Sequence, residues 1–219
     1  MGARTTYDAV IFDNDGVLTT PTDRDVLIDA MRDAFETVGV VDPSPDDVDT
    51  LLSPDVPSLR RVAADHGIDP DELWTARENA AIAAQLAELR TGRKRHYDDV
   101  TALESLSVPT AIVSNNQHET IGNVLEHCAL AAFDVWYGRE PTLEGIERKK
   151  PRPYYLERAL ADLGVENPLF VGDSRVDIAA ADAAGIDAAF IRRDHRTGYE
   201  LSAEPTHEIE SLAALPEFV

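Results

Sequence analysis

The stretch YDAVIFDNDG, residues 7–16, decides the fold of this chain. Its first six residues are mostly aromatic or aliphatic, and they run directly into a turn that contains glycine. A short apolar run bounded in this way is typical of a buried strand. We therefore predict a buried strand over residues 7–12 that ends in two acidic residues, Asp13 and Asp15.

Further apolar runs and helical patterns alternate along the rest of the chain. The predicted strands occupy residues 108–113, 169–171 and 187–191. The predicted helices that separate or follow them occupy residues 117–127, 153–163 and 176–184. Alternating strands and helices indicate a parallel sheet with helices on both faces. The predicted fold class is α/β, with a doubly wound, Rossmann-like parallel sheet.

The stretch between the first two predicted strands has a different pattern. Residues 22–95 contain amphipathic helical runs at 23–38, 57–66 and 71–89, interrupted by prolines, and no convincing strand. This length is too great for an ordinary connection between a strand and a helix. We predict an inserted α-helical domain over residues 20–96, with residues 1–19 and 97–219 forming the α/β core.

The composition restricts the environment and the partners. The chain has 41 acidic and 20 basic residues, for a net charge of -21, and only three of the basic residues are lysines. Such a field repels nucleic acid and anionic membranes, so neither is an expected partner. An acid-rich, lysine-poor chain indicates a halophilic protein, and an ordinary acidic protein is the alternative. No secretory or membrane-spanning run is visible, so a cytoplasmic location is expected.

Polar residues of a particular kind follow the predicted strands. The first strand ends at Asp13 and Asp15, the second at Ser114 and Asn115, and the third at Asp173, one helical turn before Asp177. Ligands of doubly wound sheets bind beyond these carboxyl ends. Converging carboxylates repel one another unless a cation joins them, and hard oxygen ligands suit Mg²⁺.

These residues predict phosphoryl transfer when Lys150, at the mouth of a predicted helix, is added to them. Asp13 would be the nucleophile, kept ionised by the metal. Asp15 would protonate the leaving group and then activate water. Ser114 and Lys150 would supply a hydroxyl and a positive charge to the phosphoryl oxygens.

Four motifs resemble those of haloacid dehalogenase-like hydrolases, nearest to phosphoglycolate phosphatase-like members with a helical first-type cap. They are DNDGVLT at 13–19, VSN at 113–115, KKPRP at 149–153 and VGDSRVD at 171–177. The resemblance implies a phosphoaspartyl intermediate at Asp13. It also implies Mg²⁺ held by Asp13, the backbone carbonyl of Asp15 and Asp173, with Asp177 helping directly or through water.

The remaining candidate contacts with the substrate are weaker. Gly16 and Asn115 belong to the first two motifs, and Arg60 and Arg61 in the helical insert would reach the cleft as specificity elements. Helical surface arginines often remain in solvent, which is the alternative for Arg60 and Arg61. The linker RKRH at 93–96 would either meet an anionic substrate or serve as a solvated hinge.

Several reactions of similar proteins are compatible with such a core. Asp15 and Asp173 argue against dehalogenation, which needs neither a second aspartate nor a metal. Sugar phosphomutases of this type carry a histidine where this chain has Asp25, which favours hydrolysis. The expected function is Mg²⁺-dependent hydrolysis of a small phosphorylated metabolite by a monomer or homodimer. A phosphomutase and a catalytically silent binding protein remain the alternatives.

Overall fold

The core of the protein is a parallel sheet of six strands in the order β3-β2-β1-β4-β5-β6. The computed structural model describes residues 6–128, 130, 133–201 and 203–219. The strands span Ala9–Phe12 (β1), Thr110–Gln117 (β2), Val135–Arg139 (β3), Pro168–Gly172 (β4), Asp187–Ile191 (β5) and His207–Ile209 (β6). The predicted fold class, a doubly wound α/β fold, is confirmed.

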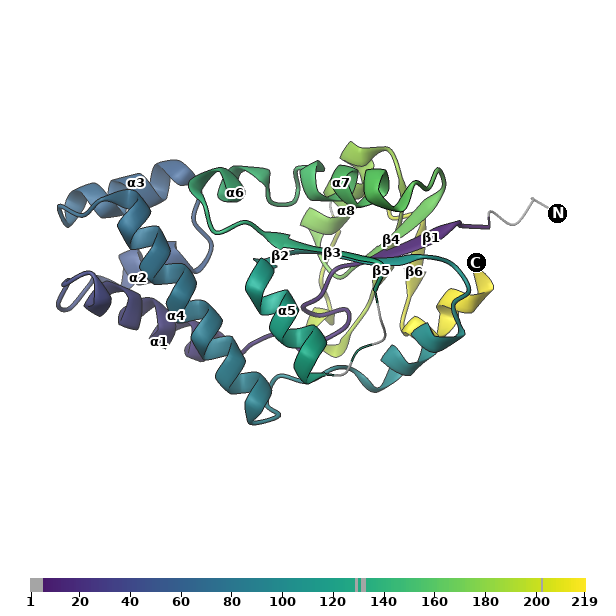
Figure 1. The fold of residues 1–219 in the computed structure, drawn as a ribbon, viewed down its shortest axis with the longest axis horizontal. Coiled ribbons are helices and arrows are strands. Elements are labelled where there is room, and N and C mark those ends of the chain that lie inside the picture. Colours follow the sequence, from purple (N-terminus) through teal and green to yellow (C-terminus); the bar gives the residue numbers. More distant parts are fainter. Residues whose placement is uncertain (1–5, 129, 131–132, 202) are drawn as a thin grey trace.

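Helices cover both faces of this sheet (Figure 1). On one face, α7 (Tyr154–Leu163) and α8 (Arg175–Ala184) pack against Ile11, Val113 and Phe170. On the other face, α5 (His118–His127) and the short 3₁₀ helices Asp98–Ser105 and Leu212–Glu217 pack against the alternate residues Val10 and Phe12. Because successive side chains of a strand point to opposite faces, β1 is apolar throughout and fully buried.

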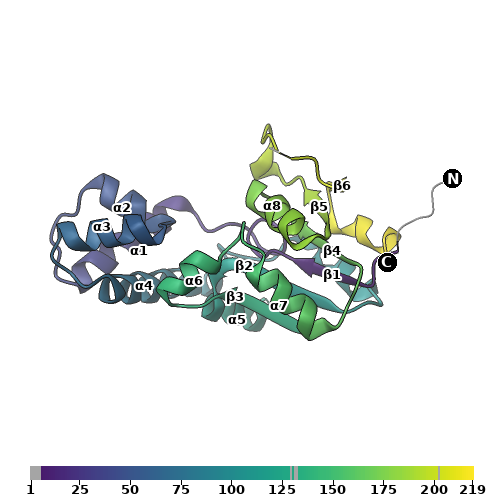
Figure 2. The same ribbon diagram turned by 90° about the horizontal axis from the view of Figure 1, so that it is seen from above.

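A second group of helices projects from the end of this core (Figures 1 and 2). Helices α1 (Arg24–Thr37), α2 (Pro45–Leu52), α3 (Val56–Asp65) and α4 (Pro70–Arg90) form what we call the helical insert. They bury an apolar cluster of their own, which includes Met31, Phe35, Leu59 and Trp74. Ile146, from the short helix α6 (Leu143–Arg148) of the core, also packs into this cluster.

Two chain segments join the helical insert to the core side by side. The Thr20 amide donates to the Arg95 carbonyl at 2.8 Å, and the Tyr97 amide donates to the Leu18 carbonyl at 3.0 Å. An isolated bridge between Thr19 and His96 lies between these two bonds. The insert therefore leaves and re-enters the core at one place, directly after the segment that carries Asp13 and Asp15.

The structure also contains elements that the sequence pattern did not predict. Strand β3 includes Gly138 and a charged residue, and β6 has only three residues, so neither has the apolar run that predicts a strand. Helix α2 begins at Pro45, which the sequence reading treated as an interruption. Proline is favoured in the first turn of a helix because its missing N–H has no partner there in any case.

The helices in the described part of the chain were compared with the length and hydropathy that a membrane span requires. None of these helices is both long enough and apolar enough to cross a bilayer.

Candidate active site

Neighbouring strands bring Asp13 and Asp173 together. Phe12 pairs with Val171 of β4, and the Asp13 amide donates to the Val171 carbonyl at 2.9 Å. Asp13 directly follows β1 and Asp173 directly follows β4, so both carboxylates lie at the same edge of the sheet. Asp177, in the first turn of α8, joins them, and the three residues offer oxygen atoms that all lie within 4.8 Å of one another.

A buried ammonium group occupies the centre of this acidic cluster. Lys150 Nζ lies 2.9 Å from Asp13 Oδ1 and 2.7 Å from Asp177 Oδ1, and only 2% of its side chain is exposed. Lys150 Nζ also donates to the Val113 carbonyl of β2 at 2.9 Å. Lys150 is therefore held between β2 and α8, with its charge directed at the predicted nucleophile.

Burial and charge perturb the ionisation of both partners. The pKa of Asp13 is raised to about 7, mainly by burial; Lys150 lowers it, and the Asp177 and Asp173 carboxylates contribute to the rise. Burial by itself lowers the pKa of Lys150, but Asp13 and Asp177 outweigh that effect and raise it above its usual range. Lys150 therefore stays charged, and the protein alone does not keep Asp13 fully ionised near neutral pH.

Asn115 and Ser114 support this centre from the end of β2. The Asn115 side chain accepts from the Lys150 amide at 2.7 Å and donates to the Lys150 carbonyl at 3.0 Å. Asn115, which we expected to contact substrate, thus uses its side-chain amide to hold the Lys150 backbone. Ser114 is 3% exposed, and its hydroxyl accepts from the Asn116 amide at 3.2 Å.

Asp177 has structural partners on both carboxylate oxygens. One oxygen faces Lys150, and the other accepts from the amide of Ser174 at 3.1 Å and from the Ser174 hydroxyl. The second set of contacts is a capping box, which satisfies amides at the start of α8. Asp177 therefore both caps a helix and fixes Lys150.

Asp15 faces away from this centre, toward the helical insert. One of its oxygens accepts from Asn116 Nδ2 at 2.6 Å, and the other contacts the ammonium group of Lys94. The Lys94 side chain is fully buried and also donates to the Thr20 carbonyl at 3.1 Å. The predicted acid/base is thus held by a lysine from the second of the two connecting segments.

Gly16 has a steric role beside Asp173. Its φ of 85° lies in the left-handed region, which a residue with a side chain seldom adopts. A Cβ at this position would also overlap the Asp173 carboxylate. The structure therefore explains Gly16 by the close approach of the two loops, whereas the sequence analysis had placed it among the substrate contacts.

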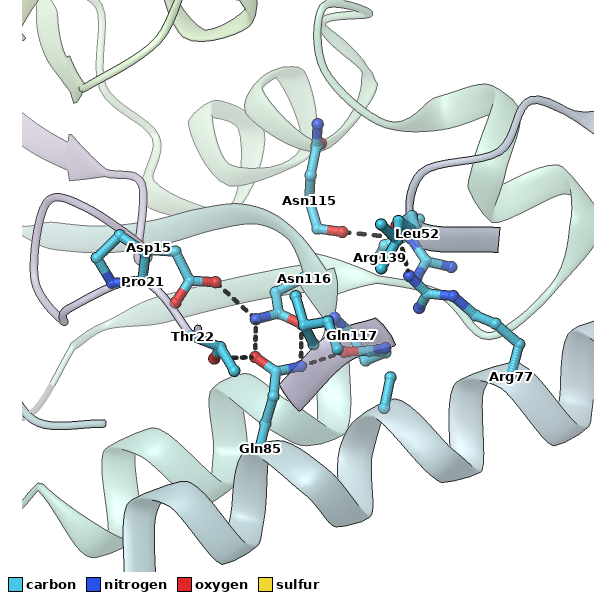
Figure 3. A pocket seen from close by; sticks show the side chains of 12 residues that line it. Asp15, Pro21, Thr22, Leu52, Arg77, Gln85, Asn115, Asn116, Gln117 and Arg139 are labelled. Atoms are coloured by element: carbon cyan, nitrogen blue, oxygen red, sulfur yellow. Dashed lines mark hydrogen bonds between the residues drawn. The ribbon is translucent and has the colours of Figure 1, made fainter. Parts of the chain in front are cut away.

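A pocket of about 270 Å³ opens between the core and the helical insert (Figure 3). Asp15 lies at one end of it, and Arg77 and Arg139 lie at the other. Between them, Gln85 of α4 and Asn116 of β2 exchange two amide hydrogen bonds, of 2.9 Å and 2.7 Å. Polar and apolar side chains line the pocket together, and they come from both parts of the molecule.

The structure does not bring Arg60 and Arg61 to this pocket. Both are exposed on α3, where Arg61 lies 3.4 Å from Asp65 one turn later. The face of α3 that is buried carries Leu59, Val62 and Ala63, so the arginine side chains point to solvent. Arg77 and Arg139 take the place in the pocket that we predicted for Arg60 and Arg61.

The cluster of Asp13, Asp173 and Asp177 fits a hard divalent cation. Three carboxylates meet there in the interior, and Lys150 contacts only those of Asp13 and Asp177. The raised pKa of Asp13 is due mainly to burial, and the two neighbouring carboxylates contribute to it. Asp173 Oδ2 has two further partners, His195 Nε2 at 2.7 Å and Arg196 Nε at 2.9 Å. Carboxylate oxygens grouped in this way suit Mg²⁺ rather than a soft metal.

Sequence reasoning missed several of these side chains. Asn116, His195 and Arg196 lie outside the segments whose spacing carried the prediction. Lys94 was named only within the linker at 93–96, as part of a substrate contact or of a solvated hinge, and the structure instead buries it against Asp15. Lys94 alone had a usable signal, because it is one of only three lysines in the chain. Lys94 contacts Asp15, Lys150 contacts Asp13, and Lys149 donates to the Pro54 carbonyl of the insert at 2.8 Å.

The fold and the site together define a class: a doubly wound α/β protein with an aspartate-bearing loop after β1 and a helical insert directly behind it. Haloacid dehalogenase-like hydrolases match this chain over residues 10–191. The chain belongs to that family.

The curated relatives that this chain matches include a phosphatase, a pyrophosphatase and a dehalogenase, and the chain spans 60% and 53% of the length of the first and the last of these. The chain is 31% identical over 166 residues to a phosphoglycolate phosphatase of Pseudomonas putida, covering 72% of this chain and 60% of that relative. It is 28% identical over 221 residues to the pyrophosphatase PpaX of Anoxybacillus flavithermus, covering 95% and 94% of the two chains. It is also 30% identical over 125 residues to an (S)-2-haloacid dehalogenase of Pseudomonas putida, covering 56% and 53%.

Solved structures share the fold. The crystal structure of CbbY from Rhodobacter sphaeroides in complex with phosphate matches with a TM-score of 0.69 at 18% identity, covering 96% of each chain. A putative phosphoglycolate phosphatase from Lactobacillus plantarum matches with a TM-score of 0.63 at 20% identity, covering 98% of this chain and all of that one.

Proposed function

We propose that this protein is a Mg²⁺-dependent phosphatase that hydrolyses a small phosphate monoester through a phosphoaspartyl intermediate at Asp13. One observation carries the proposal: Lys150 Nζ lies between Asp13 and Asp177 in a buried cluster that Asp173 completes. The matches to a phosphoglycolate phosphatase and a pyrophosphatase support phosphate chemistry. The test is hydrolysis of p-nitrophenyl phosphate and of a panel of phosphorylated metabolites, with and without Mg²⁺.

In this proposal the residues of the chain have separate roles. Asp13 attacks phosphorus, and Lys150 and Ser114 stabilise the charge on the phosphoryl oxygens. Asp13, Asp173 and the Asp15 carbonyl would hold Mg²⁺, with Asp177 acting through water or through Lys150. The metal ion, when bound, would neutralise the phosphoryl group and keep Asp13 ionised.

Asp15 distinguishes this proposal from dehalogenation. An alkoxide leaving group needs a proton, and Asp15 lines the pocket where the leaving group would lie. Lys94 and Asn116 fix the direction of its carboxylate. Asp15 would first protonate the departing oxygen and then accept a proton from the water that attacks the phosphoaspartate.

Replacement of Lys94 by methionine is expected to lower kcat for an alkyl phosphate about tenfold and for p-nitrophenyl phosphate much less. Without the ammonium group, Asp15 loses a contact that orients it. An alkoxide depends on a well-placed acid, whereas nitrophenolate leaves without one. Steady-state kinetics with both esters measure the difference, and Arg95→Met, an exposed neighbour, is the control. Equal losses for both esters would argue against a role of Lys94 in leaving-group protonation by Asp15, because the attack of water on the phosphoaspartate is common to both esters.

Mg²⁺ is expected to stabilise the fold more at pH 8 than at pH 6. Burial raises the pKa of Asp13 to about 7, so below that value the metal must displace a proton and its apparent affinity falls. At a Mg²⁺ concentration 100 times the dissociation constant, binding adds about 2.7 kcal/mol to the free energy of unfolding. Thermal unfolding with Mg²⁺ and with EDTA, at pH 6 and at pH 8, measures this stabilisation. If Mg²⁺ raised the melting temperature of the Asp173→Asn variant as much as that of the wild type, a metal site at this cluster would be contradicted.

A further inference from the structure

Two guanidinium groups lie at the end of the pocket away from Asp15 (Figure 3). Arg77 comes from α4 of the helical insert, and Arg139 ends β3 of the core. The two arginines are 8% and 4% exposed. Burial of one guanidinium group is uncommon, and two in the same pocket call for a compensating partner.

The bonding of the two arginines differs. Arg77 is well satisfied, because its Nε and Nη2 donate to the carbonyls of Leu51 and Leu52 at 3.0 Å and 2.8 Å, and its Nη1 donates to Glu78 at 2.7 Å. Arg139 donates from Nη2 to Glu78 at 2.9 Å and makes a long contact from Nε to the Asn115 carbonyl at 3.3 Å.

The third nitrogen of Arg139 has no acceptor. Nη1 is buried, and it has no hydrogen-bond partner among the described residues. The guanidinium group as a whole is kept in place, since it lies over the Trp74 ring with 4.6 Å between its carbon and the ring centre. A fixed, charged donor without an acceptor is unfavourable in the interior, and an anionic ligand would relieve it.

Positive charge is also in excess around Arg139. Glu78 supplies one carboxylate oxygen to both Arg77 and Arg139, and Lys149 adds a third cation close by, with Asp55 as the second carboxylate near it. Burial lowers the pKa of Lys149 to about 8, and the Arg139 and Arg77 charges add to that effect. A locally cationic wall in a chain of net charge -21 attracts an anion that the rest of the surface repels.

We propose that Arg139 is a specificity residue that binds a second anionic group of the substrate, a carboxylate or a second phosphoryl group, at the end of the pocket opposite Asp15. This inference rests on the proposed phosphatase function. The scissile phosphoryl group would lie near Asp13 and Lys150, and the body of the substrate would extend past Asp15 along the pocket. Arg77 and Lys149 contribute charge, whereas Arg139 supplies the direct hydrogen bond.

A structural role is the competing explanation. The bond between Glu78 of α4 and Arg139 of β3 joins the helical insert to the core, so Arg139 could serve only to hold the two together. In that case its removal would lower the activity toward every ester alike. Recognition of an anion instead predicts a loss confined to substrates that carry one.

The test compares two pairs of esters, each differing by one anionic group. Carboxymethyl phosphate is paired with 2-hydroxyethyl phosphate, and 1,3-propanediol bisphosphate with 3-hydroxypropyl phosphate. We expect the wild type to favour the anionic member of at least one pair by about tenfold to hundredfold in kcat/KM. Arg139→Met should remove that preference and leave the neutral esters nearly unchanged. The pair that responds identifies the group as a carboxylate or as a phosphoryl group.

Three comparisons make the result decisive. Arg60→Met, an exposed arginine of the insert, is the matched control and should keep the preference. Should Arg139→Met fail to fold because Glu78 is left unpaired, the double variant Arg139→Met/Glu78→Gln removes both charges. Calorimetry measures how tightly the same ester pairs bind to the Asp13→Asn variant and to the Asp13→Asn/Arg139→Met double variant. Because binding needs no turnover, this measurement tests the role of Arg139 even if no ester is hydrolysed.

The outcomes separate the two proposals. Hydrolysis of p-nitrophenyl phosphate without any preference within either pair would overturn the role of Arg139 and leave the phosphatase proposal standing. Equal losses for anionic and neutral esters in Arg139→Met would also overturn it, in favour of the structural role. Absence of hydrolysis of every ester, with tighter binding of the anionic members through Arg139, would overturn the phosphatase proposal alone.

Discussion

Replacement of Asp13 by asparagine is expected to abolish turnover, with a loss of at least about 10⁴-fold in kcat toward any ester that the wild type hydrolyses. Asparagine keeps the shape of the side chain but is a far weaker nucleophile than a carboxylate. The fold should survive, because burial disfavours the charged form of Asp13 and Lys150 retains Asp177 as a partner. Steady-state kinetics and thermal unfolding of the same preparation measure both effects.

The control for this variant is Asp182→Asn, which changes an exposed aspartate of α8 in the same domain. In the control, kcat and the melting temperature should both stay at wild-type values. In Asp13→Asn, the melting temperature without metal should be equal to or above that of the wild type, and the stabilisation by Mg²⁺ should shrink. Turnover equal to that of the wild type would remove Asp13 as the nucleophile.

Replacement of Lys150 by methionine is expected to impair both stability and activity. The ammonium group compensates Asp13 and Asp177 in the interior, and removal of one partner of a buried ion pair costs about 3–5 kcal/mol of unfolding free energy. Turnover should fall at least about 10³-fold, because the charge next to the phosphoryl group is lost as well. The variant should regain stability as the pH falls, since the uncompensated carboxylates then become protonated.

Two further variants separate these effects. Arg152→Met, an exposed residue two positions later, should behave as the wild type. Lys150→Met/Asp177→Asn removes one positive and one negative charge, so it should recover much of the stability without recovering activity. Recovery of activity in this double variant would show that Lys150 serves the fold alone. Denaturant unfolding and kinetics on matched preparations give both readouts.

The lysines of this chain show how charge is distributed between surface and site. Only three are present, and the structure places Lys94 on Asp15, Lys150 on Asp13, and Lys149 at the insert beside the pocket. No other lysine occurs in the sequence, while acidic residues dominate the composition. A strongly negative protein with an anionic substrate needs local positive charge at the site, and these residues supply it. The halophilic character inferred from the composition remains a prediction.

Most of the fold, and the grouping of Asp13, Asp173 and Lys150 in the candidate active site, could be predicted from the sequence because local patterns indicate both. The run at residues 9–12 is apolar on both faces, as a central parallel strand must be, and β4 and β5 show the same pattern. Edge strands lack that signal: β3 is only partly buried and ends in Gly138 and Arg139. Its contribution to the pocket, Arg139, was consequently missed.

The helical insert shows the limit of the same reasoning. Arg60 and Arg61 were chosen for their charge, but the residues beside them in the sequence, Leu59 and Val62, are the ones that the insert buries. Arg77, on the long helix α4, is the insert arginine that reaches the pocket. Which face of an inserted helix meets the core depends on how the whole insert packs, and the spacing of charges does not report that.

The sequence by itself determined the class of fold and the central residues Asp13, Asp173 and Lys150, because parallel strands bring their carboxyl ends to one edge wherever they occur. Only the tertiary structure decided the partners of those residues. Lys94 contacts Asp15 across 79 positions of sequence, and Arg139 contacts Glu78 across 61. Such contacts are set by the docking of the helical insert on the core, which no local pattern encodes. The pocket that would select the substrate lies at that junction.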